Sequence, residues 1–157
     1  DFIPGEIHLG NINAPVHFTI VKSLFCKPCA DSWNTLSGWL TAYPDLLRLT
    51  VRFTGYGSHD TKNTELIGAL TGIYIQSGGD AFSEALNDWN ENRDYQKWKA
   101  KYYADKPVAP QPVSFEIARW QERSFIPSVP VIFVDNRIYR YTLDDLEYLL
   151  KELVRDE

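Results

Sequence analysis

The sequence predicts an α/β domain in which helices flank a central mixed sheet. Short stretches rich in β-branched residues surround an amphipathic helical pattern near the start of the chain, and strand and helix patterns return near its end. A block of purely helical patterns separates the two parts. We therefore expect strand–helix–strand, a helical insertion over approximately 61–125, and then strand–strand–helix. The 157 residues have the size of one domain, so 1–157 is predicted to be a single unit.

The first part is predicted to be a strand, a helix and a second strand. Val16–Val21 is rich in β-branched residues and Leu47–Phe53 alternates, so each is typical of a strand. Apolar residues between them recur at steps of three and four, and Pro44 ends the run: Cys29, Trp33, Leu36, Leu40 and Tyr43. This order predicts a right-handed parallel crossover.

The helical block is predicted to contain four helices. Leu66, Ile67, Leu70, Ile73 and Tyr74 share one helical face, and Gly78–Gly79 ends that helix. Further helices are expected over 81–92, 94–104 and 114–125. The proline-rich stretch 107–112 is expected to be a stiff, non-helical connector. Five aromatic residues in the block have helical spacing, which favours a place in the core over a binding surface: Trp89, Trp98, Tyr102, Tyr103 and Trp120.

The end of the chain is predicted to be a hairpin and a helix. Pro130–Val134 and Ile138–Tyr141 read as strands joined by a tight turn at Asp135–Asn136. Thr142 and Asp145 resemble a capping box, with Asp in place of the usual Glu or Gln. Five leucines then form the apolar face of the last helix: Leu143, Leu146, Leu149, Leu150 and Leu153.

Composition excludes several classes of function. The net charge is −5 and charges of both signs are interspersed, so neither nucleic acid nor a membrane surface is an expected partner. The apolar runs reach about six residues, far below the ~20 that span a bilayer. The chain begins at Asp1 and has no methionine, so we interpret Asp1 as a processing boundary before which a leader or membrane segment can have been removed.

Both cysteines lie in the segment LFCKPC, as Cys26 and Cys29, and three interpretations are open. A Cys-x-x-Cys pair can supply half of a zinc site, but the chain has no other cysteine and its three histidines lack paired-ligand spacing. A structural disulfide across two residues would close a tiny loop and constrain little of the unfolded chain. A redox pair remains the best-supported interpretation, with no metal and no cofactor beyond the Cys26–Cys29 disulfide itself.

The redox interpretation has a physical basis. The motif lies between a strand and the first turn of a helix, where unpaired backbone N–H groups favour a thiolate on Cys26. Pro28 suits the first helical turn because its missing donor costs nothing there. Cys29 lies one turn along, so Cys26 is expected to be the exposed nucleophile and Cys29 the buried resolving thiol. Lys27, expected to be solvated, only tunes the site.

Val129–Pro130 is the second candidate feature. A proline opening a central strand is disfavoured, but becomes understandable if Val129–Pro130 is a cis peptide held for function. The Val129 backbone could then pair with an extended substrate. Together with the upstream cysteine motif, this favours the cis interpretation over an ordinary trans proline.

These motifs resemble the thioredoxin superfamily in its DsbA-like version, which carries a helical insertion. More narrowly, NAPVHFTIVKSLFCKPCADSW, ALNDWNENRDYQKW and YTLDDLEYLL are similar to the thioredoxin-like domains associated with bacterial vitamin K epoxide reductase homologues. The resemblance implies a thioredoxin fold, catalytic Cys26 and Cys29, and substrate binding at Val129 and Pro130. It further implies a monomeric extracytoplasmic domain that can be tethered to a membrane. Such a domain exchanges disulfides with protein thiols and with a membrane oxidase of the vitamin K epoxide reductase or DsbB type.

The sequence departs from this family at several positions. Thioredoxin and DsbA carry a buried acid six residues before the first cysteine, and Ile20 stands there instead. Proton transfer to the Cys29 sulfur would therefore need water or another group. Phe25 occupies a position where many relatives have tryptophan or proline, and Val129 one where the narrower family often has threonine. Phe25, Lys27 and Pro28 are expected to tune the site.

The function expected from this resemblance is a thiol–disulfide oxidoreductase that donates disulfides to folding proteins. A reductase of the cytochrome c maturation type is the alternative within the same chemistry, and the reduction potential separates the two. A non-catalytic peptide-binding module on the same scaffold is the alternative from another class.

Overall fold

The computed structural model describes residues 2–104, 108–126 and 128–155. Its strands form one five-stranded sheet in the order β1-β3-β2-β4-β5. The strands are β1 (Ile7–Gly10), β2 (Val16–Lys22), β3 (Leu47–Phe53), β4 (Val131–Val134) and β5 (Arg137–Ile138). β2 and β3 are parallel and the other neighbouring pairs are antiparallel, which confirms the predicted mixed sheet.

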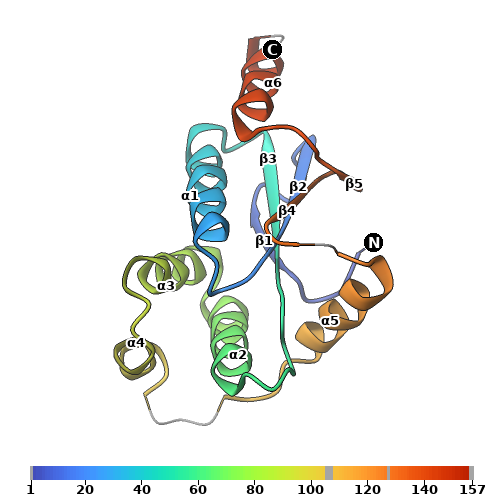
Figure 1. Cartoon of the computed structure of the whole chain (residues 1–157). Coiled ribbons are helices and arrows are strands. Elements are labelled where there is room, and N and C mark those ends of the chain that lie inside the picture. The colour runs from blue at the N-terminus through green and yellow to red at the C-terminus, as the bar shows by residue number, and fades with distance from the viewer. Residues whose placement is uncertain (1, 105–107, 127, 156–157) are drawn as a thin grey trace.

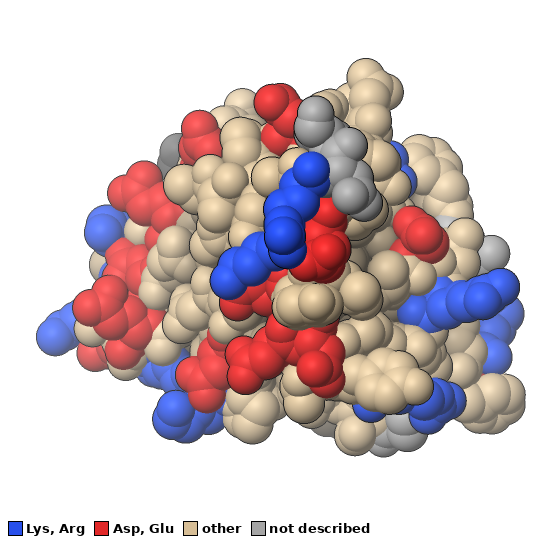
Figure 2. Space-filling model, turned by 90° about the horizontal axis from the view of Figure 1, so that it is seen from above, with Lys and Arg blue, Asp and Glu red and all other residues tan. Residues whose placement is uncertain are grey.

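Six helices surround the sheet within the described ranges: α1 (Lys27–Ala42), α2 (Thr61–Ser77), α3 (Gly79–Asn92), α4 (Tyr95–Tyr102), α5 (Pro112–Ser124) and α6 (Leu143–Arg155). Figure 1 shows α1 along one face of the sheet, α5 toward the other, and α3 beside the turn that enters α1. The helices α2 to α5 all lie between β3 and β4 in the chain. On the face that Figure 2 shows, acidic and basic side chains are interspersed.

Alternation along the strands gives the sheet two unlike faces. In β2, Phe18 and Ile20 point to the main core, where Phe18 packs on Trp39 of α1. On the opposite face, Val21 packs under α5 in a smaller apolar cluster that also contains Trp120. The large aromatic side chains of the insertion are buried, as predicted: Trp89 is 2% exposed, Trp98 4% and Trp120 7%.

Several boundaries differ from the sequence-based expectations. The strand β1 was not predicted, although Ile7 and Leu9 alternate with His8 as a half-buried strand should. The connector was predicted to be non-helical through Pro112, but α5 begins at that proline, because the first helical position needs no backbone donor. Residue 107 of that connector lies outside the described residues.

The end of the chain is packed less tightly than predicted. The return strand was expected over Ile138–Tyr141, but β5 covers only two residues, and Tyr139 adds one further backbone bond to Ile132. In α6, Leu146 and Leu150 are buried, whereas Leu149 and Leu153 are 53% and 44% exposed. The predicted five-leucine face is therefore only partly correct, because α6 extends beyond the end of the sheet (Figure 1).

No helix in the described part of the chain combines the length and the apolar character needed to cross a membrane.

Candidate active site

The two cysteines lie where β2 gives way to α1. Cys26 is the N-cap residue of α1, and its Sγ accepts a hydrogen bond of 3.2 Å from the backbone N–H of Cys29. Pro28 occupies the first turn of the helix. The sulfur of Cys26 therefore lies against the open N–H groups of the helix end, which stabilise negative charge.

The two thiols differ in exposure. Cys26 is partly exposed, whereas Cys29 is completely buried, and both are free thiols in this structure. Burial raises the pKa of the Cys29 thiol, and its hydrogen bond to Cys26 raises it further. The expected division into an accessible and a buried sulfur is thus present in the structure.

The other residues of the motif surround the accessible sulfur. Phe25 is 46% exposed and packs edge-to-face on Trp89, with 5.6 Å between ring centroids. Lys27 is exposed, and its Nζ lies 3.4 Å from Asp31 Oδ2. Exposed ion pairs of this kind contribute little to stability. Pro28 is also exposed.

The insertion holds this segment in place. The indole Nε1 of Trp89 in α3 donates a buried hydrogen bond of 2.8 Å to the carbonyl of Leu24. Trp33 of α1 donates a second bond, of 2.6 Å, to Asn87 Oδ1 of α3. The helix α3 therefore fixes both the residues before the cysteines and the helix that carries them.

The Val129–Pro130 peptide bond is cis, as predicted. Pro130 directly precedes β4, in which Val131 is paired with Val21 of β2. Because β2 continues within a few residues to Cys26, this register brings Pro130 to the same end of the sheet as the cysteines. Val129 and Pro130 are both half-buried.

Lys22, the last residue of β2, belongs to the site and was missed at the sequence level. Its side chain is 0% exposed, and its Nζ has no hydrogen-bond partner among the described residues. Burial lowers the pKa of Lys22 to about 8, although the thiolates of Cys29 and Cys26 act in the opposite direction. The sequence does contain a signal for it, because Lys22 lies in the apolar run FTIVKSLF. In a strand it would point to the same face of the sheet as Phe18 and Ile20.

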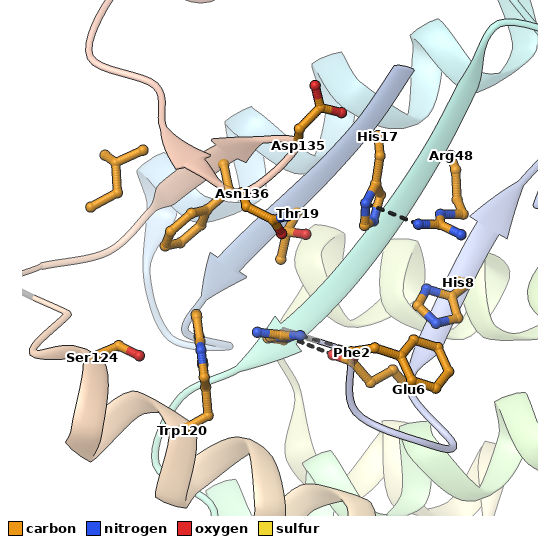
Figure 3. Close-up of a pocket in the computed structure, with 13 residues that line it drawn as sticks. Phe2, Glu6, His8, His17, Thr19, Arg48, Trp120, Ser124, Asp135 and Asn136 are labelled. Atoms are coloured by element: carbon orange, nitrogen blue, oxygen red, sulfur yellow. Dashed lines mark hydrogen bonds and ion pairs between the residues drawn. The ribbon is translucent and has the colours of Figure 1, made fainter. Parts of the chain in front are cut away.

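A separate polar cavity of about 630 Å³ lies on the other face of the sheet, and the cysteines do not line it (Figure 3). Arg48 Nη2 lies 3.0 Å from His17 Nδ1, and His17 Nε2 lies 2.8 Å from Thr50 Oγ1. Thr50 Oγ1 also lies 2.7 Å from His8 Nδ1. His17 thus belongs to a chain of hydrogen bonds in this polar cavity, which the thiols do not line.

No protein-family model matches the sequence, and no curated protein matches it. Solved structures do match. The catalytic domain of Proteus mirabilis ScsC superposes with a TM-score of 0.72 at 14% identity, over 94% of this chain and 88% of that one. Oxidised BdbD from Bacillus subtilis superposes with a TM-score of 0.72 at 11% identity, over 94% of this chain and 92% of that one.

A periplasmic thioredoxin-like protein from Salmonella enterica serovar Typhimurium gives a TM-score of 0.69 at 16% identity, over 95% of this chain and 90% of that one. These likenesses agree with the strand order and with the helices inserted between β3 and β4. The chain therefore has the thioredoxin fold, in the DsbA-like version with a helical insertion.

Proposed function

We propose that this protein is a thiol–disulfide oxidoreductase in which Cys26 is the nucleophile and Cys29 the resolving thiol. The observation that carries the proposal is the position of Cys26 as the N-cap of α1, accepting the Cys29 N–H while Cys29 itself is buried. One sulfur is accessible to a substrate, and the second is within one helical turn to close or open the disulfide.

The exchange conserves atoms and electrons. A substrate thiolate attacks Cys26 Sγ in the oxidised pair, the S–S bond breaks, and Cys29 leaves as a thiolate. A second substrate thiolate then attacks the substrate sulfur of the mixed disulfide, so the substrate is oxidised and Cys26 is released reduced. Val129 and Pro130, at the same end of the sheet, are proposed to bind the extended substrate through the Val129 backbone.

The finer assignment is that the protein acts as an oxidant of folding proteins outside the cytoplasm. Support comes from the fold it shares with a periplasmic thioredoxin-like protein and with the catalytic domain of ScsC. The resemblance of the motifs supports reoxidation by a membrane partner of the vitamin K epoxide reductase or DsbB type. A peptide-binding role for the aromatic insertion has no comparable support, because Trp89, Trp98 and Trp120 are buried.

Two matched serine variants test the chemistry. Cys26→Ser is expected to reduce insulin reduction and oxidative refolding to the uncatalysed background, because no other accessible sulfur can form the mixed disulfide. Cys29→Ser is expected to accumulate a mixed disulfide with glutathione at Cys26, visible by intact mass, because the resolving sulfur is gone. Catalysis by Cys26→Ser at the wild-type rate would exclude the proposal, and a wild type inactive in both assays would favour a binding module.

A further inference from the structure

Lys22 is a buried cation without a hydrogen-bonded partner. It lies at the end of β2, is 0% exposed, and its Nζ has no hydrogen-bond partner among the described residues. The ring of Phe53 has its centroid 5.9 Å from Nζ, which is a weak contact. Burying an ammonium in this way is costly, and a lysine that only filled core volume would be better replaced by an apolar residue. The position therefore calls for a functional explanation.

The ionisable groups around Lys22 point to the redox site. Those that act on its ammonium are Cys29 and Cys26 of α1 and Arg93 at the end of α3. The thiolates stabilise the ammonium, whereas Arg93 and burial destabilise it. The interaction is reciprocal, because Lys22 also favours the thiolate of Cys29.

We propose that Lys22 is the proton partner of Cys29, in the role for which Ile20 leaves no buried acid. The inference rests on the proposed thiol–disulfide exchange. When Cys29 attacks the mixed disulfide at Cys26, Lys22 as the neutral amine takes the Cys29 thiol proton. When a substrate thiolate opens the Cys26–Cys29 disulfide, the electron pair of the S–S bond goes to Cys29 Sγ, and the Lys22 ammonium returns a proton to it.

The energetics of the mixed disulfide favour this role. In the reduced protein, a hydrogen bond to Cys26 and the negative charge on Cys26 both raise the pKa of Cys29. Neither contribution survives once Cys26 is bonded to substrate, because its sulfur then carries no charge. Burial still raises the pKa of Cys29, and the backbone hydrogen bond at Ser23 and the charge of Lys22 oppose it. Lys22 therefore matters most in the state in which Cys29 must become a thiolate.

The geometry requires a small movement. Nζ makes no hydrogen bond to either sulfur in this structure, so the proton passes after a rotation of the flexible lysine stem or through one water molecule. Only a proton passes between Lys22 and Cys29, and the oxidant in each step is the disulfide that is attacked.

The first test is Lys22→Met, which keeps the length and apolar stem but removes the ionisable nitrogen. Glutathione is loaded onto Cys26 from its disulfide, and its release by Cys29 is followed by rapid acid quench across a pH series. Removing the charge of Lys22 raises the pKa of Cys29 and so lowers its thiolate fraction. A less acidic thiol regains only part of this loss through its greater nucleophilicity, so release is expected to be at least about threefold slower at neutral pH.

The pH profile separates this role from a structural one. Release in the variant should keep rising with pH after the wild-type rate has levelled, because only solvent base then removes the Cys29 proton. Lys97→Met, in which a lysine whose side chain is 87% exposed in α4 is replaced, is the matched control and should leave rate and profile unchanged. A wild-type rate and profile in Lys22→Met would overturn the inference while leaving the proposed function intact, and a wild type unable to form the mixed disulfide would instead overturn the proposed function.

A second measurement needs no variant, so it holds even if Lys22→Met does not fold. The ¹³C resonance of the Lys22 Cε is titrated in the oxidised and the reduced wild type. Because the thiolates that raise the pKa of Lys22 are absent from the disulfide form, its titration midpoint should be lower in the oxidised protein. Equal midpoints in the two forms would show that Lys22 does not sense the cysteines, which overturns the inference.

Discussion

His17 shows how a single side chain makes stability depend on pH. Arg48 can only donate, so its bond of 3.0 Å fixes His17 Nδ1 as an unprotonated acceptor, and Nε2–H then donates to Thr50. Burial lowers the pKa of His17 to about 4, and the positive charge of Arg48 and the neighbouring His8 add to this effect. Asp135 and Glu6 oppose it without reversing it.

The sign of the resulting pH dependence follows from this shift. Between about pH 6.5 and about 4, His17 binds a proton in the unfolded chain but not in the folded protein. The free energy of unfolding therefore falls as the pH drops through this window. One such group contributes a slope of at most about 1.4 kcal/mol per pH unit. His17→Gln is expected to flatten the acid limb of urea unfolding measured across this range. His59→Gln, at an exposed position before α2, is the control; equal slopes in wild type and His17→Gln would contradict the assignment.

At the same scale, the sequence predicted the placement of the two cysteines and the cis bond better than their surroundings. Cys26 and Cys29 follow from spacing and from their place before a helix, and the cis bond at Val129 from a proline where a strand begins. Lys22 does not follow, because alternation tells which face of β2 it occupies but not that α1 brings two thiols over that face. The burial of a charged side chain such as Lys22 can be recognised only when the helix that packs over it is known.

At the scale of elements, the insertion acts as a support for the Leu24–Cys26 segment and for α1. Helix α3 contacts the residues before the cysteines through the bond from Trp89 to the Leu24 carbonyl, and contacts α1 through Asn87. The periodicity of the insertion predicts its helices and buried aromatics. It does not predict which segment these helices contact. The two hydrogen bonds join residues that are 65 and 54 positions apart in the sequence, so they leave no local pattern.

Trp89→Phe tests this support. The phenyl ring keeps most of the packing but leaves the Leu24 carbonyl buried without its donor, which costs about 1–3 kcal/mol of unfolding free energy. The loosened Leu24–Cys26 segment should also change the rate at which Cys26 reacts with an aromatic disulfide reagent.

Trp98→Phe provides the matched comparison. Its Nε1 donates a hydrogen bond of 2.9 Å to the carbonyl of Ala85. This carbonyl lies within α3 and not beside the cysteines. A similar loss of stability with unchanged Cys26 reactivity is expected. If both variants altered reactivity equally, the effect would belong to the whole core and not to the Leu24 bond.

At the scale of the whole molecule, the direction of electron flow depends on which redox form the fold stabilises. In the reduced form, Cys26 Sγ accepts the Cys29 N–H at the N-terminus of α1, and a thiolate on either sulfur stabilises the Lys22 ammonium. In the disulfide form, neither sulfur carries charge, and the ammonium remains buried within the field of Arg93. We therefore predict that the reduced pair is the more stable form, in which case the oxidised pair would be a strong oxidant.

The predicted consequence is a reduction potential nearer to about −120 mV than to about −270 mV, measured by equilibration with glutathione. The two values differ by about 150 mV, or about 7 kcal/mol for a two-electron couple, so the measurement separates them clearly. Urea unfolding should show the reduced protein as the more stable form, although the oxidised chain carries an extra crosslink, because a loop closed across two residues constrains the unfolded state little. A potential near −270 mV together with a more stable oxidised form would mean that the fold stabilises the disulfide, and the protein would then be a reductase.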